Sequence, residues 1–171
     1  MLSLIQTLFD IVRLRKGPDA IPYSPMLFTL IVAMWLLAGF AMMASTPEMD
    51  ARDYVIGTLS GVIGLACYAA VIVVAGKRPR LLQATTALLG CGALLSLIFV
   101  AANAALTPLL AASTVNLIVT LILLWSVPVE GHIISRTIDR HWYVGLMIAM
   151  AVFIFQLILY AVIDPAAGTG A

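Results

Sequence analysis

Five long runs of apolar residues dominate this sequence, and each is about as long as a helix that crosses a lipid bilayer. They cover residues 25–44, 54–75, 81–102, 108–127 and 142–163. A helix needs about 20 apolar residues to cross the hydrocarbon core, because it rises only about 1.5 Å per residue. The sequence therefore predicts an all-α integral membrane bundle of five transmembrane helices.

Little of the chain remains for anything outside the membrane. Of its 171 residues 63% are apolar and only 10% are charged, whereas soluble domains carry about 25% charged residues. The net charge of +1 argues against nucleic-acid binding, which needs a concentrated basic surface. The sequence contains no metal-binding helix, nucleophile elbow or phosphate-binding loop motif. We therefore expect neither an enzyme nor a bound cofactor or metal.

The segment before the first run predicts an N-terminal amphipathic helix that lies in the membrane interface, within residues 1–17. Leu4, Leu8 and Ile11 recur on one helix face, and Gly17 is followed by a proline that ends the pattern. The basic residues follow the apolar stretch instead of preceding it, which is the reverse of a signal peptide.

Positively charged residues predict the orientation of the chain. Of the nine Lys and Arg residues, only Arg52 falls on one side of a five-span arrangement. The other side carries Arg13, Arg15, Lys16, Lys77, Arg78, Arg80, Arg136 and Arg140. Cytoplasmic connections retain such residues. We expect a multi-pass protein of the bacterial cytoplasmic (inner) membrane, with a cytoplasmic N-terminus and a periplasmic C-terminus in a flexible tail, residues 164–171.

A strip of small residues marks the second run. Gly57, Gly61 and Gly64 lie on one helix face, which allows another helix to approach closely. Two interpretations are open. The strip is either an oligomerisation face or a packing face against a neighbouring helix of the same bundle. The third run offers a matching surface of small residues within positions 87–92.

Uncharged polar side chains also recur inside the runs. Gln156 is the most isolated of them, and an amide at that depth should bind a partner on another helix. Asn116 lies at a similar depth in the fourth run and is the predicted partner. The alternative is the polar lining of a substrate path, on which five residues would converge: Gln83, Thr86, Asn116, Thr120 and Gln156.

Titratable residues between the fourth and fifth runs form the most distinctive segment. Pro128 is expected to bend or end the fourth helix, and residues 130–141 to connect the two runs at the cytoplasmic edge. The residues of this connection that could dock a partner are Glu130, His132, Arg136, Asp139 and Arg140. The other interpretation is a solvated elbow in which Asp139 balances Arg136. The spacing of the acids and histidines here matches no familiar metal-binding motif.

With these boundaries, no Asp, Glu, Lys, Arg or His lies inside a run away from its ends. Ionisable residues inside the membrane are typical of ion-coupled transporters, and their absence argues against that class. The sequence therefore favours a non-enzymatic scaffold, adaptor or subunit of a membrane complex. Its expected partners are the lipid bilayer and either another membrane protein or further copies of itself. A small transporter or channel formed by oligomerisation is the alternative.

The arrangement of five spans, a cytoplasmic N-terminal segment, short connections and a short outer tail resembles the Yip domain (Ypt-interacting-protein) family. The resemblance covers most of the chain between Pro25 and Ile163 and is one of architecture. Eukaryotic members of that family are trafficking adaptors without catalytic residues, so the resemblance implies a scaffold or adaptor. It assigns no site to any residue of this chain.

Overall fold

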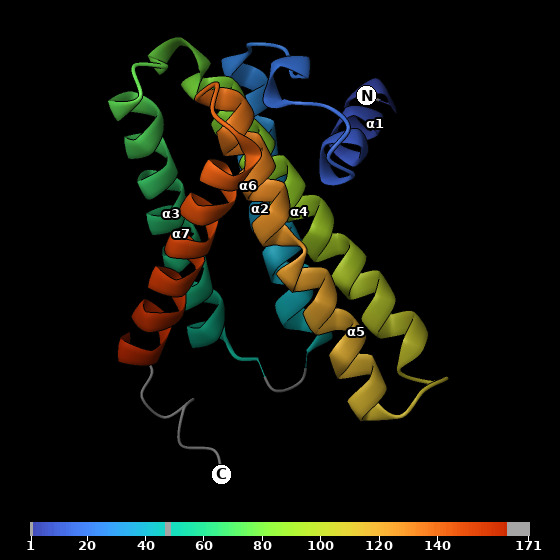
Figure 1. Ribbon diagram of the computed structural model, residues 1–171. Coiled ribbons are helices and arrows are strands. Elements are labelled where there is room, and N and C mark those ends of the chain that lie inside the picture. Colours follow the sequence, from blue (N-terminus) through green and yellow to red (C-terminus); the bar gives the residue numbers. More distant parts are fainter. Residues whose placement is uncertain (1, 47–48, 164–171) are drawn as a thin grey trace.

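The computed structural model describes residues 2–46 and 49–163, and within them it contains helices and no strands (Figure 1). Five helices are long and apolar enough to cross a membrane. The predicted all-α architecture with five apolar helices is therefore confirmed. The expected flexible tail, residues 164–171, lies outside the described residues.

The first helix, α1, is Leu2–Val12, and a short 3-10 turn, η1, follows at Pro18–Ala20. The long helices are α2 (Pro25–Ser45), α3 (Ala51–Val74), α4 (Leu81–Leu106), the successive α5 (Ala112–Leu124) and α6 (Ser126–Thr137), and α7 (Trp142–Ile163). A second 3-10 turn, η2 (Arg78–Arg80), leads from α3 into α4. Together α5 and α6 make up the fourth membrane-crossing segment.

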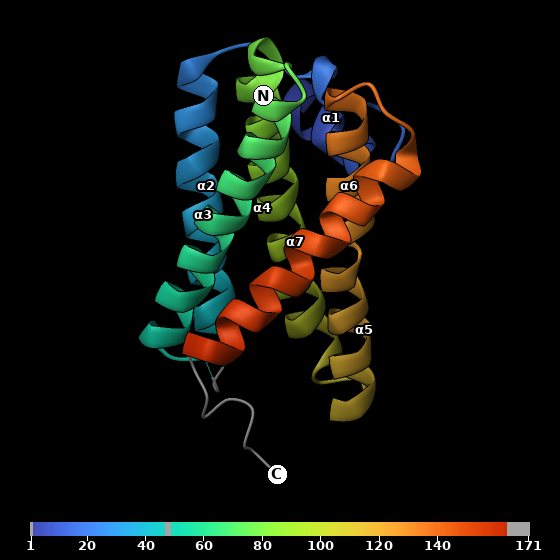
Figure 2. The same ribbon diagram turned by 60° about the vertical axis from the view of Figure 1, so that its left-hand side comes forward.

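Helix α4 is the most deeply buried of the five crossings. The main neighbour of α4 is α2, and the main neighbour of α6 is α7 (Figure 2). The main neighbour of α3 is also α7. Contacts of α3 with α2 and α4 are sparse. The bundle therefore has a loosely packed interior on the side where α3 faces these two helices.

Side chains at the helix starts explain where α2 and α3 begin. The hydroxyl oxygen of Ser24 accepts a hydrogen bond from the Leu27 amide at 3.3 Å, and Pro25 occupies the first helical turn. At α3, Asp50 and Asp53 form a reciprocal capping box, each carboxylate accepting from the other residue's amide. Both caps satisfy backbone donors that the helix itself leaves free.

The fourth crossing does not end at residue 127 as expected; the helix is interrupted close to Pro128 and continues beyond it. The chain breaks its helical pattern at Trp125 and starts again as α6, which continues to Thr137. Pro128 is the third residue of α6, where a missing amide costs little because first-turn amides have no partner within the helix. Residues 130–137, expected in a connection, are therefore helical and belong to the fourth segment that is long and apolar enough to cross a membrane.

The N-terminal segment contains a helix that is shorter than the predicted range, residues 1–17. Helix α1 ends at Val12, and Leu14 adopts a left-handed conformation with φ 59°. The side chains of Leu8 and Ile11 are buried against the bundle, where α1 contacts α4 and α6. Because it packs on two helices, α1 is an integral part of the fold.

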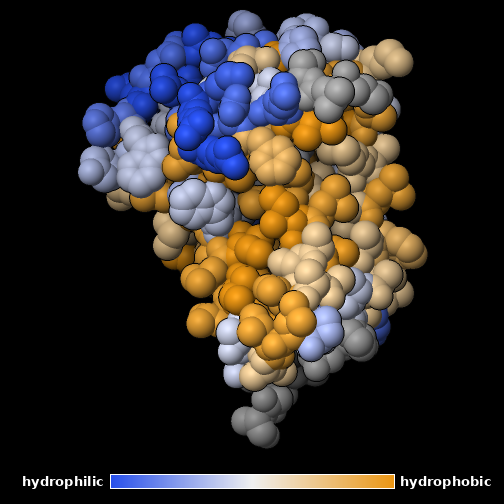
Figure 3. All heavy atoms as spheres, turned by 90° about the vertical axis from the view of Figure 1, so that its right-hand side faces the viewer, coloured by the Kyte–Doolittle hydropathy of each residue, from blue (hydrophilic) through white to orange (hydrophobic). Residues whose placement is uncertain are grey.

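Polar residues gather at the end of the bundle that carries α1, η1, η2 and the connection from α6 to α7 (Figure 3). We call this the basic end, because the eight Lys and Arg residues expected to share one side lie in these segments. Of the described residues, Arg52 is the single basic one at the opposite end, where α2 meets α3. The charge asymmetry seen in the sequence is thus also present in three dimensions.

Candidate functional site

Glu130 lies within the fourth crossing and points toward α3. Its Oε2 accepts a hydrogen bond of 2.6 Å from the hydroxyl group of Tyr68, a residue of α3 that is almost fully buried. Placing a carboxyl group inside a membrane-crossing helix costs several kcal/mol, about 3 on insertion scales. Such a residue is therefore a candidate functional group.

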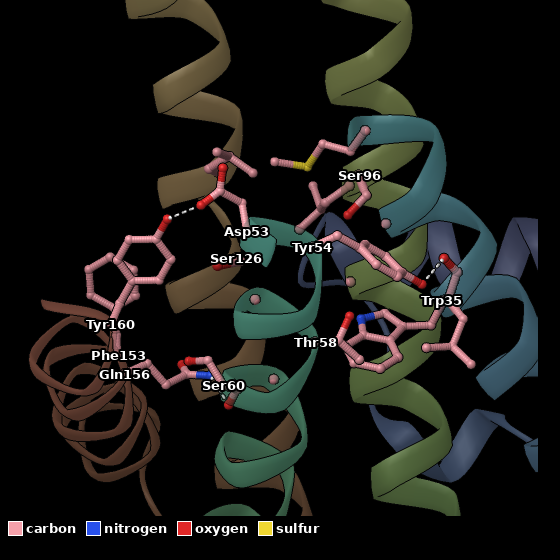
Figure 4. Close-up of a pocket in the computed structure, with 18 of the residues that line it drawn as sticks. Trp35, Asp53, Tyr54, Thr58, Ser60, Ser96, Ser126, Phe153, Gln156 and Tyr160 are labelled. Atoms are coloured by element: carbon pink, nitrogen blue, oxygen red, sulfur yellow. Dashed lines mark hydrogen bonds between the residues drawn. The ribbon is translucent and has the colours of Figure 1, made fainter. Parts of the chain in front are cut away.

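A cavity of about 500 Å³ extends away from this carboxyl group, between α2, α3, α4, α7 and the junction of α5 and α6 (Figure 4). Ser126 and Glu130 both line it, since they are four residues apart and share one face of α6. Its walls include the aromatic rings of Trp35, Tyr54 and Phe153. Cavities of this size are typical of sites for small organic molecules.

A second carboxyl group lines the cavity toward the opposite end. Asp53 accepts a hydrogen bond of 3.2 Å from the hydroxyl group of Tyr160 on α7 (Figure 4). On α3, Asp53 and Tyr68 are fifteen residues apart, which corresponds to about 22 Å along the helix axis. The two carboxyl groups therefore stand near the two ends of an elongated cavity.

The glycine strip of α3 explains why the cavity exists. A Cβ atom added to Gly57 would meet no atom within 4 Å, and one added to Gly61 would lie 2.7 Å from the ring of Trp35. Both glycines line the cavity. Gly64 instead faces the side-chain amide of Gln156. The strip therefore borders the cavity and α7, and does not pack against the small residues of α4.

Gln156 holds α7 to α3 next to the cavity. Its amide nitrogen donates a hydrogen bond of 3.0 Å to the backbone carbonyl of Ser60 (Figure 4). The predicted pairing of Gln156 with Asn116 is thus wrong, because Asn116 is exposed on the outer surface of α5. Hydropathy placed both amides at a similar depth but could not indicate which helices are neighbours.

Two glycines position α6 against α7. A Cβ atom on Gly145 would collide with the carbonyl oxygen of Gly131, and one on Gly131 would lie 2.8 Å from the Cα atom of Leu146. The backbones of the two helices are therefore in direct contact, as small residues allow in membranes. This crossing lies beside Glu130 and fixes the side of α6 that faces the cavity.

At the basic end, Asp139 joins the connection after α6 to the turn after α3. It has a left-handed conformation with φ 53°, and its carboxylate binds Lys77 at 2.6 Å and Arg80 at 2.7 Å. Hydrogen bonds from these two cations lower the pKa of Asp139 to about 2. The expected balance between Asp139 and Arg136 is therefore wrong.

His132 and Trp125 anchor the segment that follows α1. A ring nitrogen of His132 lies 3.0 Å from the carbonyl oxygen of Lys16, and the indole nitrogen of Trp125 donates to the carbonyl of Val12 at 3.0 Å. His132 is buried. Trp125 thus satisfies a carbonyl in the last turn of α1, and His132 contacts one in the segment that follows this helix.

The five residues predicted as a docking surface do not form one surface. Glu130 faces the cavity, His132 is buried beneath α1, and Asp139 binds two cations. Arg136 and Arg140 are exposed at the basic end. Within the described part of the chain, no group of three or more His, Cys, Asp or Glu side chains could hold a metal ion.

The polar residues proposed for a substrate path do not converge either. Gln83 donates to the carbonyl of Ile21 at 2.8 Å, and Thr86 donates to the carbonyl of Leu82 in its own helix at 2.6 Å. Thr120 is exposed. Of this predicted set, only Gln156 lines the cavity.

The main residue that sequence reasoning misplaced is Glu130. A helical signal was present, because Val127, Gly131, Ile134 and Ile138 follow one another at intervals of four, three and four residues and all are buried. Continuing this pattern through Pro128 places Glu130 in the fourth of the helices that are long and apolar enough to cross a membrane. Its contact with Tyr68 carries no sequence signal of its own.

Known proteins give no assignment for this site. No family model, curated protein or solved structure matched the chain. The resemblance to the Yip domain family therefore remains an expectation that rests on architecture.

Proposed function

We propose that this protein binds a small organic molecule inside the membrane, in the cavity that Glu130 lines, as a transporter or membrane-embedded binding protein. The observation that carries the proposal is a carboxyl group that belongs to a membrane-crossing helix and borders a cavity of about 500 Å³. This cavity is formed within a single chain. The transport alternative considered from the sequence therefore does not require oligomerisation.

The hydrogen bonding of Glu130 supports a role beyond structure. Only Oε2 has a partner, the hydroxyl group of Tyr68; Oε1 has none in the described part of the chain. Oε1 is not among the buried polar atoms that lack a partner, so it is accessible to a molecule in the cavity that Glu130 lines. A ligand in the cavity would supply the missing partner.

Thiol accessibility tests whether the cavity is open to water. In a background with both native cysteines replaced by alanine, Thr58→Cys would place a thiol on the cavity wall, and Leu59→Cys would place one on the outer surface of the same helix. We expect a water-soluble methanethiosulfonate reagent to modify Thr58→Cys and to leave Leu59→Cys unmodified. A lipid-facing thiol lacks the water needed for ionisation.

The proposal would be overturned if the methanethiosulfonate reagent modified neither of the two thiols in the folded protein. Denaturation in detergent provides the control, since both variants must then react fully. Gly57→Phe gives a second test, because Gly57 lines the cavity and a Cβ atom added there meets no atom within 4 Å. It should slow the modification of Thr58→Cys, whereas Val62→Phe on the exposed face should not.

A scaffold or subunit role, which the sequence favours, is a second candidate with its own support. Asn116 and Thr120 are exposed on one face of α5, four residues apart, although α5 belongs to a membrane-crossing segment. An amide that faces lipid gains from binding another helix. Asn116→Leu should then reduce a crosslinked oligomer or complex, and an unchanged crosslinking pattern would contradict this role.

The charge asymmetry supports a placement of the basic end in the cytoplasm of a bacterial inner membrane. This placement puts the N-terminus inside the cell and turns the Asp53 end of the cavity toward the outside. It also places α1 near the lipid headgroups, where Arg13 and Arg15 would meet anionic lipids.

A further inference from the structure

We propose that the ligand of this cavity is an organic cation with an apolar, preferably aromatic body, and that the carboxylate of Glu130 binds its positive charge. The inference rests on the proposed function, since it requires that the cavity admit a ligand. It adds the chemical class of that ligand and the residue that selects it.

The charges around the cavity are of one sign. Its acidic lining residues are Asp53 and Glu130, and no Lys, Arg or His of the described residues lines it. Two of the cations that follow α3, Lys77 and Arg80, are bound by Asp139 at 2.6 and 2.7 Å. A positive ligand would therefore be favoured by a cavity whose titratable lining residues are all acidic, and a negative one would be disfavoured.

The rest of the lining favours an apolar body on that cation. The rings of Trp35, Tyr54, Phe153 and Tyr160 face the cavity together with leucine and methionine side chains. Aromatic faces attract cations, and Trp is the strongest of them. A molecule that combines a positive charge with aromatic groups would satisfy the carboxylate and the walls at the same time.

A hard inorganic ion fits this lining poorly. Calcium takes six to eight oxygen ligands and magnesium requires near-octahedral coordination. Around Glu130 the structure offers one carboxyl group that already accepts a hydrogen bond from Tyr68, and aromatic neighbours instead of further carboxylates. The geometry therefore favours an organic cation over a metal ion.

A pair of probes with the same shape and opposite charge tests the inference. Tetraphenylphosphonium and tetraphenylborate would each be titrated into the purified protein in lipid nanodiscs, with binding measured by equilibrium dialysis. We expect saturable binding of tetraphenylphosphonium and none of tetraphenylborate. Glu130→Gln should weaken the cation's binding about tenfold or more, and Glu130→Asp should restore part of it. Asp10→Asn, an acid remote from the cavity, should leave it unchanged.

A second measurement keeps the test independent of substitutions at Glu130. At Thr58→Cys, a trimethylammonium methanethiosulfonate should react faster than the sulfonate reagent, after correction for their rates with a free thiol. Equal corrected rates, equal binding of both tetraphenyl ions, or unchanged binding to a folded Glu130→Gln variant would overturn the cation assignment. Reaction without charge preference would leave the cavity proposal standing, whereas no reaction with either reagent would remove both.

Discussion

Replacing Gly145 by alanine should disrupt the crossing of α6 and α7. The new Cβ atom would collide with the carbonyl oxygen of Gly131 and lie 2.8 Å from the amide nitrogen of Ser135. Both obstructing atoms belong to the backbone, so a change of side-chain rotamer cannot relieve the contact. The two helices would have to separate beside Glu130.

The size of the effect depends on two opposing terms. Overpacking costs about 1–3 kcal/mol, and the upper end applies here because backbone cannot yield as a side chain does. The better helix propensity of alanine offsets about 1 kcal/mol of that cost. We therefore expect Gly145→Ala to lower the free energy of unfolding by about 2 kcal/mol.

Gly57 supplies the matched control for this prediction. It is also a helical glycine, but a Cβ atom added there meets no atom within 4 Å. Gly57→Ala should therefore raise the free energy of unfolding by about 0.5–1 kcal/mol. Unfolding of both variants and the wild-type protein would be followed in the same mixed micelles as denaturing detergent is added. A Gly145→Ala variant as stable as wild type would refute the close crossing.

Three further predictions concern other parts of the fold. Reporter tags at the N-terminus and after Lys77 should be cytoplasmic and a tag after Asp50 external; a cytoplasmic tag after Asp50 would contradict the topology. In a double-mutant cycle, Tyr68→Phe and Glu130→Leu should show a coupling energy of about 1 kcal/mol in unfolding, since interhelical hydrogen bonds contribute up to about 1.7 kcal/mol; additive effects would exclude the pair. The pKa of Asp139 is lowered from 3.8 to about 2 in the folded protein. Its contribution to stability is therefore fully present at pH values above the ordinary pKa of 3.8 and is lost as the pH falls toward 2. Thermal unfolding between about pH 5 and 2 should therefore depend on pH more steeply in wild type than in Asp139→Asn.

The positions of the spanning helices could be read from the sequence, because hydropathy and helix-start residues act locally. The first run was expected at residues 25–44 and α2 is Pro25–Ser45; the fifth was expected at 142–163, and α7 has those bounds. Composition alone makes such segments helical in lipid, where the backbone must satisfy its own hydrogen bonds.

The end of the fourth crossing was not predictable from Pro128 alone. A proline in the first turn of a helix and a proline that ends a helix look the same in sequence, and only the contacts of the residues after them tell the two apart. Here Gly131 allows α6 to contact the backbone of α7, and that tertiary contact lies in the segment expected to be a connection.

The candidate site was the least predictable feature. The cavity depends on which helices are neighbours, and apolar periodicity inside a membrane gives little information on this, since lipid and protein interior are equally apolar. The pairs formed by Glu130 with Tyr68 and by Gln156 with Ser60 join residues 62 and 96 positions apart. Neither pair has a local signature.

The side of the membrane from which Glu130 can be reached is the sharpest test of a cavity inside the bundle. In a cysteine-free background, Glu130→Cys and Arg136→Cys would each be exposed to a membrane-impermeant thiol reagent, added to oriented vesicles from one side at a time. The two residues are six positions apart in α6, but Glu130 lines the cavity and Arg136 is exposed at the basic end. We predict that Arg136→Cys reacts from the side of the basic end and Glu130→Cys only from the opposite side. Reaction of both from the side of the basic end would place Glu130 in a surface connection and contradict the site.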